Sequence, residues 1–502
     1  MSKLAMAAVA VCASAAFALY SRAAWPWVGL GFVALAPWLV ALDRLATPRG
    51  AFAAGLTMAV AFELAVFGWF ALAITDYTGA PALVHLAILA LASPALQPQF
   101  MTAALARSFV RRNGGGSLAI VLVTATTYVA TEAVAPKLFG DTLGYPLYGS
   151  LWLRQGADVT GVPGLTFVIV LVNACIAAAA QAYRRRGAPE AIVPVGAALG
   201  LVVVLASYGA WRCHLLASRA NGEGITVGLV QADLDHYDRM AAEIGRFETV
   251  RLILDQHVER SAPALARDDL ALLVWPETVY PTTFGKPKSD DGAAFDREIV
   301  DFVARAGVPL IFGAYDTDGE AEFNAAFFLT PDAGGAHPLA IYRKTRLFPL
   351  TERVPAFLES EWLRRAMPWL GTWRAGEGAK VVPMRVGART TAASPEPRTI
   401  HVAPLICYDV LDPELARAAV RAGADVIVTL SNDSWFAFGP GAQLHMLGAA
   451  FRSIETRRPQ VRATNTGISA VIDATGTVTA SAGVDARATL VETIVPERDV
   501  TT

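Results

Sequence analysis

Long apolar stretches in the first 211 residues constrain this chain more than any other feature of its sequence. Each is about long enough to cross a ~30 Å hydrocarbon core at 1.5 Å per residue. Only 17% of the chain is charged, against roughly one quarter in soluble domains. We therefore predict a transmembrane domain of about seven helices over residues 1–211. The candidate spans are 4–20, 24–42, 51–75, 82–106, 117–135, 162–183 and 191–211.

The first apolar stretch has two interpretations. Lys3, the apolar run after it and the small residues Ala13-Ser14-Ala15 are also typical of a cleaved signal peptide. A second apolar stretch follows almost at once, so we favour a retained helix over a removed one.

Charges in the loops predict the orientation of these helices, because cytoplasmic loops carry an excess of Lys and Arg. With the N-terminus in the cytoplasm, the cytoplasmic loops carry nine such residues and the outer loops three. Seven crossings then place residue 212 onward outside the cytoplasm. The nine are Lys3, Arg44, Arg49, Arg107, Arg111, Arg112, Arg184, Arg185 and Arg186, and the three are Arg22, Lys137 and Arg154.

A few ionisable residues lie within or beside the predicted spans. These are Glu63, Asp76, His85 and Glu132. Charged groups at membrane depth are costly and usually face protein or a water-filled interior. Glu63 and His85 can therefore line a path for a headgroup or a substrate. The alternative is that they pair structurally or reach the interface.

After a predicted linker at 212–224, the composition becomes that of an ordinary globular domain. Strand and helix patterns alternate without a break, which predicts one large α/β domain over residues 225–502. The expected strands are 225–232, 270–275, 308–314, 323–329, 339–342, 380–386, 399–407, 425–431, 460–465, 468–473 and 489–494. The expected helices are 239–260, 292–306, 412–422 and 443–457.

Charge and cysteine usage exclude several functions. A net charge of −2 offers no basic surface for nucleic acid. The cysteines are Cys12, Cys175, Cys213 and Cys407, and their scattered spacing indicates neither a disulfide framework nor a metal site. We expect no metal and no cofactor.

Three strand ends carry residues suited to nucleophilic catalysis. Glu277 follows the strand at 270–275, Lys344 follows the strand at 339–342, and Cys407 ends the strand at 399–407. A carboxylate can take the thiol proton, and an ammonium can stabilise an oxyanion. Each residue alone reads more simply as a buried cysteine or a surface charge. Their placement at matching strand ends favours the catalytic interpretation.

The motifs around these residues resemble the Glu-Lys-Cys motifs of the nitrilase superfamily. The spans before them make the chain similar to its membrane-embedded branch, the apolipoprotein N-acyltransferases, over roughly residues 24–475. The motifs are Trp275-Pro276-Glu277, Tyr342-Arg343-Lys344 and Ile406-Cys407-Tyr408-Asp409. Further similarity lies in 347–355, Asn432-Asp433-Ser434-Trp435-Phe436, 457–470, Leu143-Gly144-Tyr145 and 158–164.

The resemblance implies a four-layer αββα sandwich after the membrane domain, and a catalytic set within it. Cys407 would be the nucleophile, Glu277 the general base and Lys344 the oxyanion stabiliser. Glu352 would orient the lysine, and Tyr408 and Asp409 would shape the pocket behind the cysteine.

The implied reaction is ping-pong. An acyl chain would move from a phospholipid to Cys407 as a thioester, and then to the N-terminal amine of a diacylglyceryl-cysteine lipoprotein. The implied location is the bacterial inner membrane, with the catalytic domain on the periplasmic side.

The segment 356–370 mixes apolar, aromatic and charged residues, as a lid dipping into the headgroup region would. The alternative is a short helix packed on the domain. The lid candidates are Phe357, Leu358, Trp362, Leu363 and Trp369.

Some features depart from the family. Gln231-Ala232-Asp233 and Tyr237-Asp238 replace a stretch that helps to form the family's acceptor pocket, so the resemblance implies acyl transfer more directly than it implies a lipoprotein acceptor. The sequence also ends without the family's last spanning helix, so the seven predicted helices would have to hold the domain. Two alternatives stay open: a membrane-anchored amidohydrolase acting on a small amide, and a catalytically silent protein that binds lipid or a partner.

Overall fold

The computed structural model divides the chain into two compact units. The helical unit holds Met1–Ala217 and Ala437–Leu447, and the α/β unit holds Ser218–Phe436 and Gly448–Thr502. Each unit is described by itself. The described residues are 2–75, 79–139, 141–219, 222–234, 237–332, 334–349, 351–354, 359–366, 371–387, 397–436 and 439–498.

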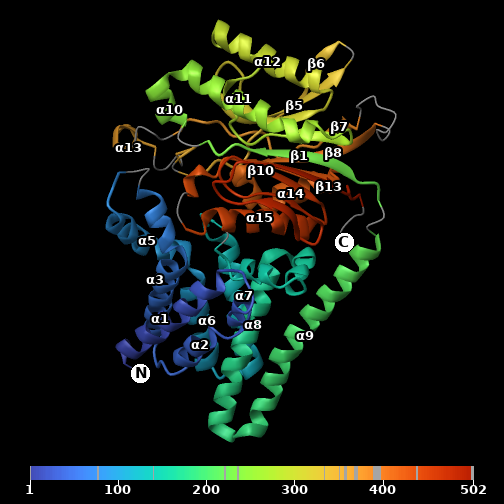
Figure 1. The fold of residues 1–502 in the computed structure, drawn as a ribbon. Coiled ribbons are helices and arrows are strands. Elements are labelled where there is room, and N and C mark those ends of the chain that lie inside the picture. The colour runs from blue at the N-terminus through green and yellow to red at the C-terminus, as the bar shows by residue number, and fades with distance from the viewer. Residues whose placement is uncertain are drawn as a thin grey trace. The chain divides into compact units, whose positions relative to one another are not determined.

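Long apolar helices dominate the helical unit (Figure 1). Among the described residues, five helices are long and apolar enough to cross a membrane, or up to six if one bent pair counts as a single span. The helices are α1 Lys3–Tyr20, η1 Trp27–Phe32, α2 Ala36–Leu42, α3 Pro48–Ala73, α5 Ala82–Leu96, α6 Gln99–Arg112, α7 Ser117–Val134, η2 Tyr145–Gly149, η3 Leu153–Gly156, α8 Ala157–Arg186 and α9 Ala188–Arg219.

The predicted span at 24–42 is not one regular helix. It consists of the 3₁₀ helix η1 followed by the short helix α2. Asn173 of α8 explains the break, because its side chain meets the backbone groups that the interruption leaves open. Its Oδ1 accepts hydrogen bonds from the N–H groups of Leu35 and Ala36, and its Nδ2 donates to the Gly31 carbonyl at 2.8 Å. One buried amide therefore ties this segment to α8.

The predicted span at 82–106 is bent. Helices α5 and α6 meet at an angle of 44° around Pro98, where proline cannot continue the hydrogen-bond ladder. The predicted linker also begins later than expected, because α9 continues to Arg219. Most apolar side chains of α9 are exposed within the unit, as expected for a helix that faces lipid.

Two sheets form the centre of the α/β unit. The first has the order β13-β1-β2-β4-β5-β6, with β3 beside β4, and the second has the order β12-β11-β10-β9-β8-β7. The strands are β1 Ile225–Gln231, β2 Leu270–Val274, β3 Tyr280–Thr283, β4 Leu310–Thr317, β5 Glu322–Asp332, β6 Gly335–Arg343, β7 Val382–Val386, β8 Arg398–Ile406, β9 Val426–Ser431, β10 Gln460–Thr464, β11 Ser469–Ile472, β12 Val478–Ala482 and β13 Ala488–Ile494.

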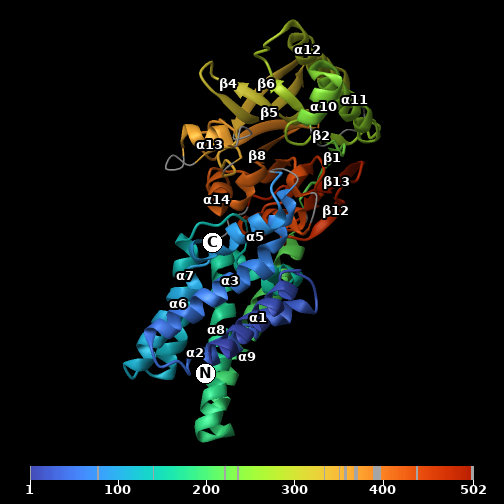
Figure 2. The same cartoon turned by 90° about the vertical axis from the view of Figure 1, so that its left-hand side faces the viewer.

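Helices cover the outer face of each sheet, and this makes four layers, αββα (Figure 2). Inward side chains of both sheets share one core, for example Val227 and Val274 with Val402 and Val428. A second core lies between the first sheet and its helices. The helices of the unit are α10 Tyr237–Ile244, α11 Arg246–Leu265, α12 Asp290–Ala306, α13 Glu361–Ala366, η4 Cys407–Leu411, α14 Pro413–Arg421, η5 Ser434–Phe436 and, from Gly448 onward, α15 Gly441–Thr456.

The predicted fold class is confirmed, and every strand that the sequence predicted is present to within a few residues. Two short strands, β3 and β12, were not predicted. The helix expected at 239–260 is two helices, because Gly245 adopts a positive φ of 90° between α10 and α11.

Candidate active site

Cys407 lies where β8 ends and the 3₁₀ helix η4 begins. Its backbone is left-handed, with φ of 48°, a conformation that is uncommon for a residue with a side chain. The neighbouring strand ends share this feature: Thr278 after β2 has φ of 59°, and Asp433 after β9 has φ of 60°. Strain of this kind clusters at functional sites. Strained turns thus follow three strands of the two sheets, β2, β8 and β9.

Glu277 is buried just beyond β2 and is held by three donors. Its Oε1 accepts from Asn324 Nδ2 at 2.6 Å and from Lys344 Nζ at 3.2 Å. Its Oε2 accepts from the backbone N–H of Asn432 at 2.9 Å. Gly313 on β4 allows this packing, because a Cβ there would overlap the backbone of Glu277. The carboxylate is therefore fixed in one orientation.

Lys344 follows β6 and lies between two carboxylates. Its Nζ is 3.2 Å from Glu277 Oε1 and 2.7 Å from Glu352 Oε1, and the side chain is 1% exposed. Burial by itself lowers the pKa of the ammonium, but the negative charges of Cys407, once it is ionised, and of Glu277 and Glu352 outweigh it and hold that pKa well above its usual value. The lysine thus stays cationic.

Glu352 is fixed from both sides. Its Oε1 accepts from Lys344, and its Oε2 accepts from the Phe348 N–H at 2.8 Å. The predicted role of orienting the lysine agrees with this geometry and stays a prediction.

Asp409 ties two loops together. Its Oδ2 accepts from Tyr342 O–H at 2.9 Å and from Ile406 N–H at 3.0 Å. Its Oδ1 accepts from the N–H groups of Thr345 and Arg346. The residues flanking Lys344 and those flanking Cys407 are thereby joined through one buried carboxyl. The Tyr408 ring packs edge-on against Phe348, with centroids 5.0 Å apart.

The charges around Cys407 determine how its thiol can react. Burial, followed by the negative charge of Glu277, raises the pKa of the thiol well above its usual value, and Lys344 opposes the rise only in part. The resting group is then a thiol rather than a thiolate. Attack on a carbonyl therefore requires a base that takes the proton as the sulfur reacts. The predicted roles of Glu277 as this base and of Lys344 as the oxyanion stabiliser stay predictions.

The sequence did not predict two of the groups that hold Glu277. Asn324 lies inside β5, and Asn432 acts through its main chain. A polar Asn within the otherwise apolar 323–329 strand was the one available signal for Asn324. No sequence signal marks a backbone donor.

The structure describes only part of the predicted lid. Trp362 and Leu363 lie on the short helix α13, where the Trp362 side chain is 72% exposed. Phe357, Leu358 and Trp369 lie outside the described residues. The role of this segment stays a prediction.

Ionisable residues of the helical unit are buried in a polar network. Gln97 Nε2 donates to Glu63 Oε2 at 2.7 Å and to Asp141 Oδ2 at 2.5 Å. Lys137 lies 3.5 Å from Asp141. His85 and Glu132 are also buried, and Asp76 lies outside the described residues. A path for substrate along Glu63 and His85 stays a prediction.

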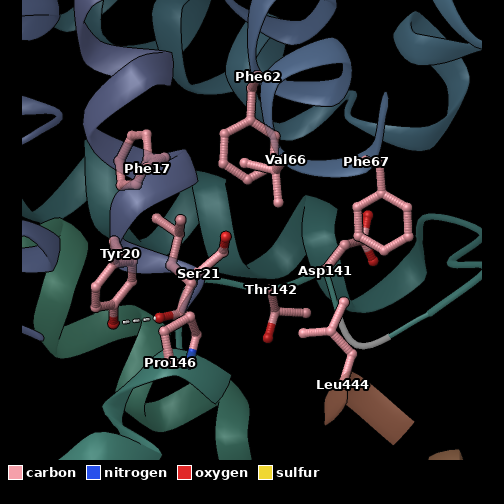
Figure 3. Close-up of a pocket in the computed structure, with 11 residues that line it drawn as sticks. Phe17, Tyr20, Ser21, Phe62, Val66, Phe67, Asp141, Thr142, Pro146 and Leu444 are labelled. Carbon is pink, nitrogen blue, oxygen red and sulfur yellow. Dashed lines mark hydrogen bonds between the residues drawn. The ribbon is translucent and has the colours of Figure 1, made fainter. Parts of the chain in front are cut away.

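A small cavity lies next to this network (Figure 3). Its volume is about 20 Å³, enough for roughly one water-sized group. Apolar and aromatic side chains form most of its wall, among them Phe17, Phe62, Phe67 and Leu444, with Asp141 at one side.

Comparison with known proteins gives the affiliation of the α/β unit. Residues 227–499 match the family described as Carbon-nitrogen hydrolase. The chain belongs to the carbon-nitrogen hydrolase family. Its N-terminal part, residues 9–175, matches the Apolipoprotein N-acyltransferase N-terminal domain. The first match falls within the predicted α/β domain, and the second falls within the predicted transmembrane domain.

Relatives of this chain align along most of its length. An apolipoprotein N-acyltransferase of Geobacter metallireducens is 29% identical over 460 residues, which is 89% of this chain and 81% of that protein. One of Bdellovibrio bacteriovorus is 26% identical over 90% of this chain and 81% of its own. The resemblance inferred from the motifs is confirmed. The solved structure of Saccharomyces cerevisiae Nit3, of the nitrilase superfamily, is 19% identical, covers 55% of this chain and 92% of its own, and has a TM-score of 0.39.

Proposed function

We propose that this protein is a membrane-embedded N-acyltransferase that uses Cys407 as its nucleophile. The observation that carries the proposal is a pairing within one chain. The buried Glu277–Lys344–Glu352 cluster lies beside a cysteine at a strained strand end, and an N-terminal half made of apolar helices precedes it. The named relatives share both halves.

In the first half-reaction the acyl donor is a phospholipid. Glu277 takes the Cys407 thiol proton as the sulfur attacks the ester carbonyl, and Lys344 stabilises the tetrahedral oxyanion. Collapse breaks the ester bond, the departing alkoxide takes the proton from Glu277, and lysophospholipid leaves. The product on the protein is a thioester.

In the second half-reaction the acceptor is the N-terminal amine of a diacylglyceryl-cysteine lipoprotein. The neutral amine attacks the thioester carbonyl, Glu277 takes a proton from the attacking nitrogen, and Lys344 again meets the oxyanion. Collapse breaks the C–S bond, and the Cys407 sulfur leaves and regains a proton from Glu277. The acyl chain is now an amide.

Two further features belong to the proposal. The exposed Trp362 on α13 fits a lid that touches lipid and limits access of water to the thioester. The excess of cationic residues in one set of loops fits a catalytic unit outside the cytoplasm of a bacterial inner membrane.

Intact-mass spectrometry of the full chain in phospholipid tests this function. We expect the wild type to gain one fatty-acyl mass, to lose it when a diacylglyceryl-cysteine peptide is added, and to convert that peptide to an amide. Cys407→Ala should gain nothing, whereas Cys213→Ala should behave as the wild type. An adduct that drains to free fatty acid and ignores the peptide would indicate a hydrolase. Intact phospholipid with no adduct would contradict acyl transfer altogether.

A further inference from the structure

Asn432 is the backbone donor that fixes Oε2 of Glu277. It follows β9 directly, and its N–H points at Glu277 Oε2 at 2.9 Å. A main-chain group can hold this direction only if the turn that carries it is itself fixed. The next residue, Asp433, is in the left-handed region, which costs energy for a residue with a side chain.

A buried ion pair holds this strained turn. Arg462 Nη2 on β10 donates to Asp433 Oδ2 at 2.7 Å, and both side chains are fully buried. Ser431 Oγ donates to the other oxygen, Oδ1, at 2.5 Å. The Asp433 carboxylate is thus held by Ser431 on β9, the strand before the turn, and by Arg462 on β10, the strand beside β9.

The hydrogen bonds to Glu277 show why the direction of the Asn432 N–H matters. A carboxylate has about four acceptor positions. Among the described residues, two donors occupy Oε1 and one occupies Oε2. Oε2 is therefore the oxygen with room for the thiol proton.

The same ion pair affects the electrostatics of Cys407. A carboxylate oxygen of Asp433 lies within 4.8 Å of Cys407 Sγ. An uncompensated negative charge at that distance disfavours a thiolate, and the charge of Asp433 indeed raises the pKa of Cys407. Arg462 supplies the compensating positive charge.

We propose that Asp433 and Arg462 form a positioning pair for the site, which aims the Asn432 N–H at Glu277 and offsets the Asp433 charge beside Cys407. Neither residue touches the reacting atoms in this account. The inference rests on the proposed function only in making Glu277 the acceptor of the thiol proton.

The test is the pH dependence of Cys407 alkylation by iodoacetamide in the full chain, followed by peptide mass spectrometry so that Cys407 is read separately from the other cysteines. In Arg462→Met the Asp433 charge is uncompensated and the turn is loosened. We expect the midpoint to rise by about one pH unit and alkylation at neutral pH to slow about tenfold. Arg462→Lys keeps the charge and should restore most of the rate.

Arg458→Met is the matched control. Arg458 is also buried near the start of β10, but its Nε donates to the Ala424 carbonyl, away from Glu277. It should leave the midpoint unchanged. An unchanged midpoint in folded Arg462→Met, or an equal shift in Arg458→Met, would overturn the proposal.

Loss of one partner of a buried ion pair can prevent folding, so Ser431→Ala provides a second test. It removes one hydrogen bond to Asp433 and leaves both charges in place. We expect a smaller shift in the same direction, with alkylation slowed roughly threefold, and no shift would overturn the proposal. Alkylation needs no acyl donor. The midpoint shifts can therefore appear even if acyl transfer fails, which separates this inference from the proposed function.

Discussion

At the scale of single residues, the orientation of Glu277 depends on groups that never meet a substrate. Asn324 supplies the shortest of its hydrogen bonds, at 2.6 Å, from inside β5. Loss of a hydrogen bond to a charged group costs about 1.5–3 kcal/mol. We therefore expect Asn324→Ala to slow acylation of Cys407 by about 10- to 100-fold. Rapid-quench intact-mass measurement gives this rate.

A substitution at the far end of the same strand is the control for Asn324. Thr330→Ala changes β5 without touching Glu277, and it should acylate at the wild-type rate. If both variants slow the reaction equally, the effect comes from the strand rather than from the hydrogen bond.

Asp409 predicts a pH effect of its own. Burial raises the pKa of this carboxyl to about 6, although the N–H groups of Arg346 and Ile406 oppose the rise. As the pH falls through 6 the carboxyl gains a proton, and a neutral acid cannot accept all four of its hydrogen bonds. We expect acylation to fall with an apparent pKa near 6, and Asp409→Asn to be slow at every pH.

The sign of the stability effect separates this loss of activity from unfolding. The unfolded carboxyl titrates near 3.9, so the folded protein binds this proton more tightly. Above pH 6 the ionised, buried carboxyl lowers the free energy of unfolding, and this free energy increases again as the pH falls. Circular dichroism should therefore show no unfolding caused by Asp409 between pH 6 and 5. Parallel loss of structure and activity in the wild type, but not in Asp409→Asn, would contradict this assignment.

At the scale of elements, the sequence predicted the position of a residue well wherever that position depends only on the strand that carries it. The apolar runs before Glu277, Lys344 and Cys407 ended within about a residue of β2, β6 and β8. The sequence did not predict contacts that depend on how two strands pair. Asn324 reaches Glu277 because β5 pairs with β4 in one register, and pairing registers are not written in a single strand. No pattern in the sequence predicted the left-handed turns at Thr278, Cys407 and Asp433.

Helix α13 allows a prediction about the lid. Its Trp362 side chain is mostly exposed, where an indole would suit a membrane interface better than water. We expect Trp362→Ala to reduce acylation of Cys407 from phospholipid in vesicles several-fold. It should leave acylation from a soluble short-chain thioester unchanged. Equal losses with both donors would assign α13 to the α/β unit's own structure instead.

At the scale of the whole molecule, the side on which catalysis occurs depends on the segment between α1 and α3. Six crossings would return the α/β unit to the side of the N-terminus, and seven would place it opposite. Trp27–Leu42 decides between them, and it is shorter than the other spans. Its regular turns alone rise about 22 Å, at 2.0 Å per 3₁₀ residue and 1.5 Å per α residue.

Contacts within the helical unit support a crossing. At the start of the segment, the Tyr20 hydroxyl donates to the Leu143 carbonyl at 2.7 Å, beyond the C-terminal end of α7. At its end, Asp43 pairs with Arg107 at 2.6 Å, near the end of α6 and before α7 begins. Helix α7 itself is 18 residues long, or about 27 Å. The segment thus runs from one end of the unit to the other.

With seven crossings, the excess of cationic residues in one set of loops predicts that the α/β unit lies outside the cytoplasm. Labelling of single cysteines in bacterial cells, with the native cysteines replaced, tests this. Lys288→Cys lies on an exposed loop of the α/β unit, and Asn113→Cys lies in the turn between α6 and α7. We expect a membrane-impermeant maleimide to label position 288 in cells whose inner membrane is sealed, and position 113 only after permeabilisation. Label at position 113 but not at position 288 before permeabilisation would contradict the predicted side, and label at both would mean that only an even number of α7, α8 and α9 cross the membrane.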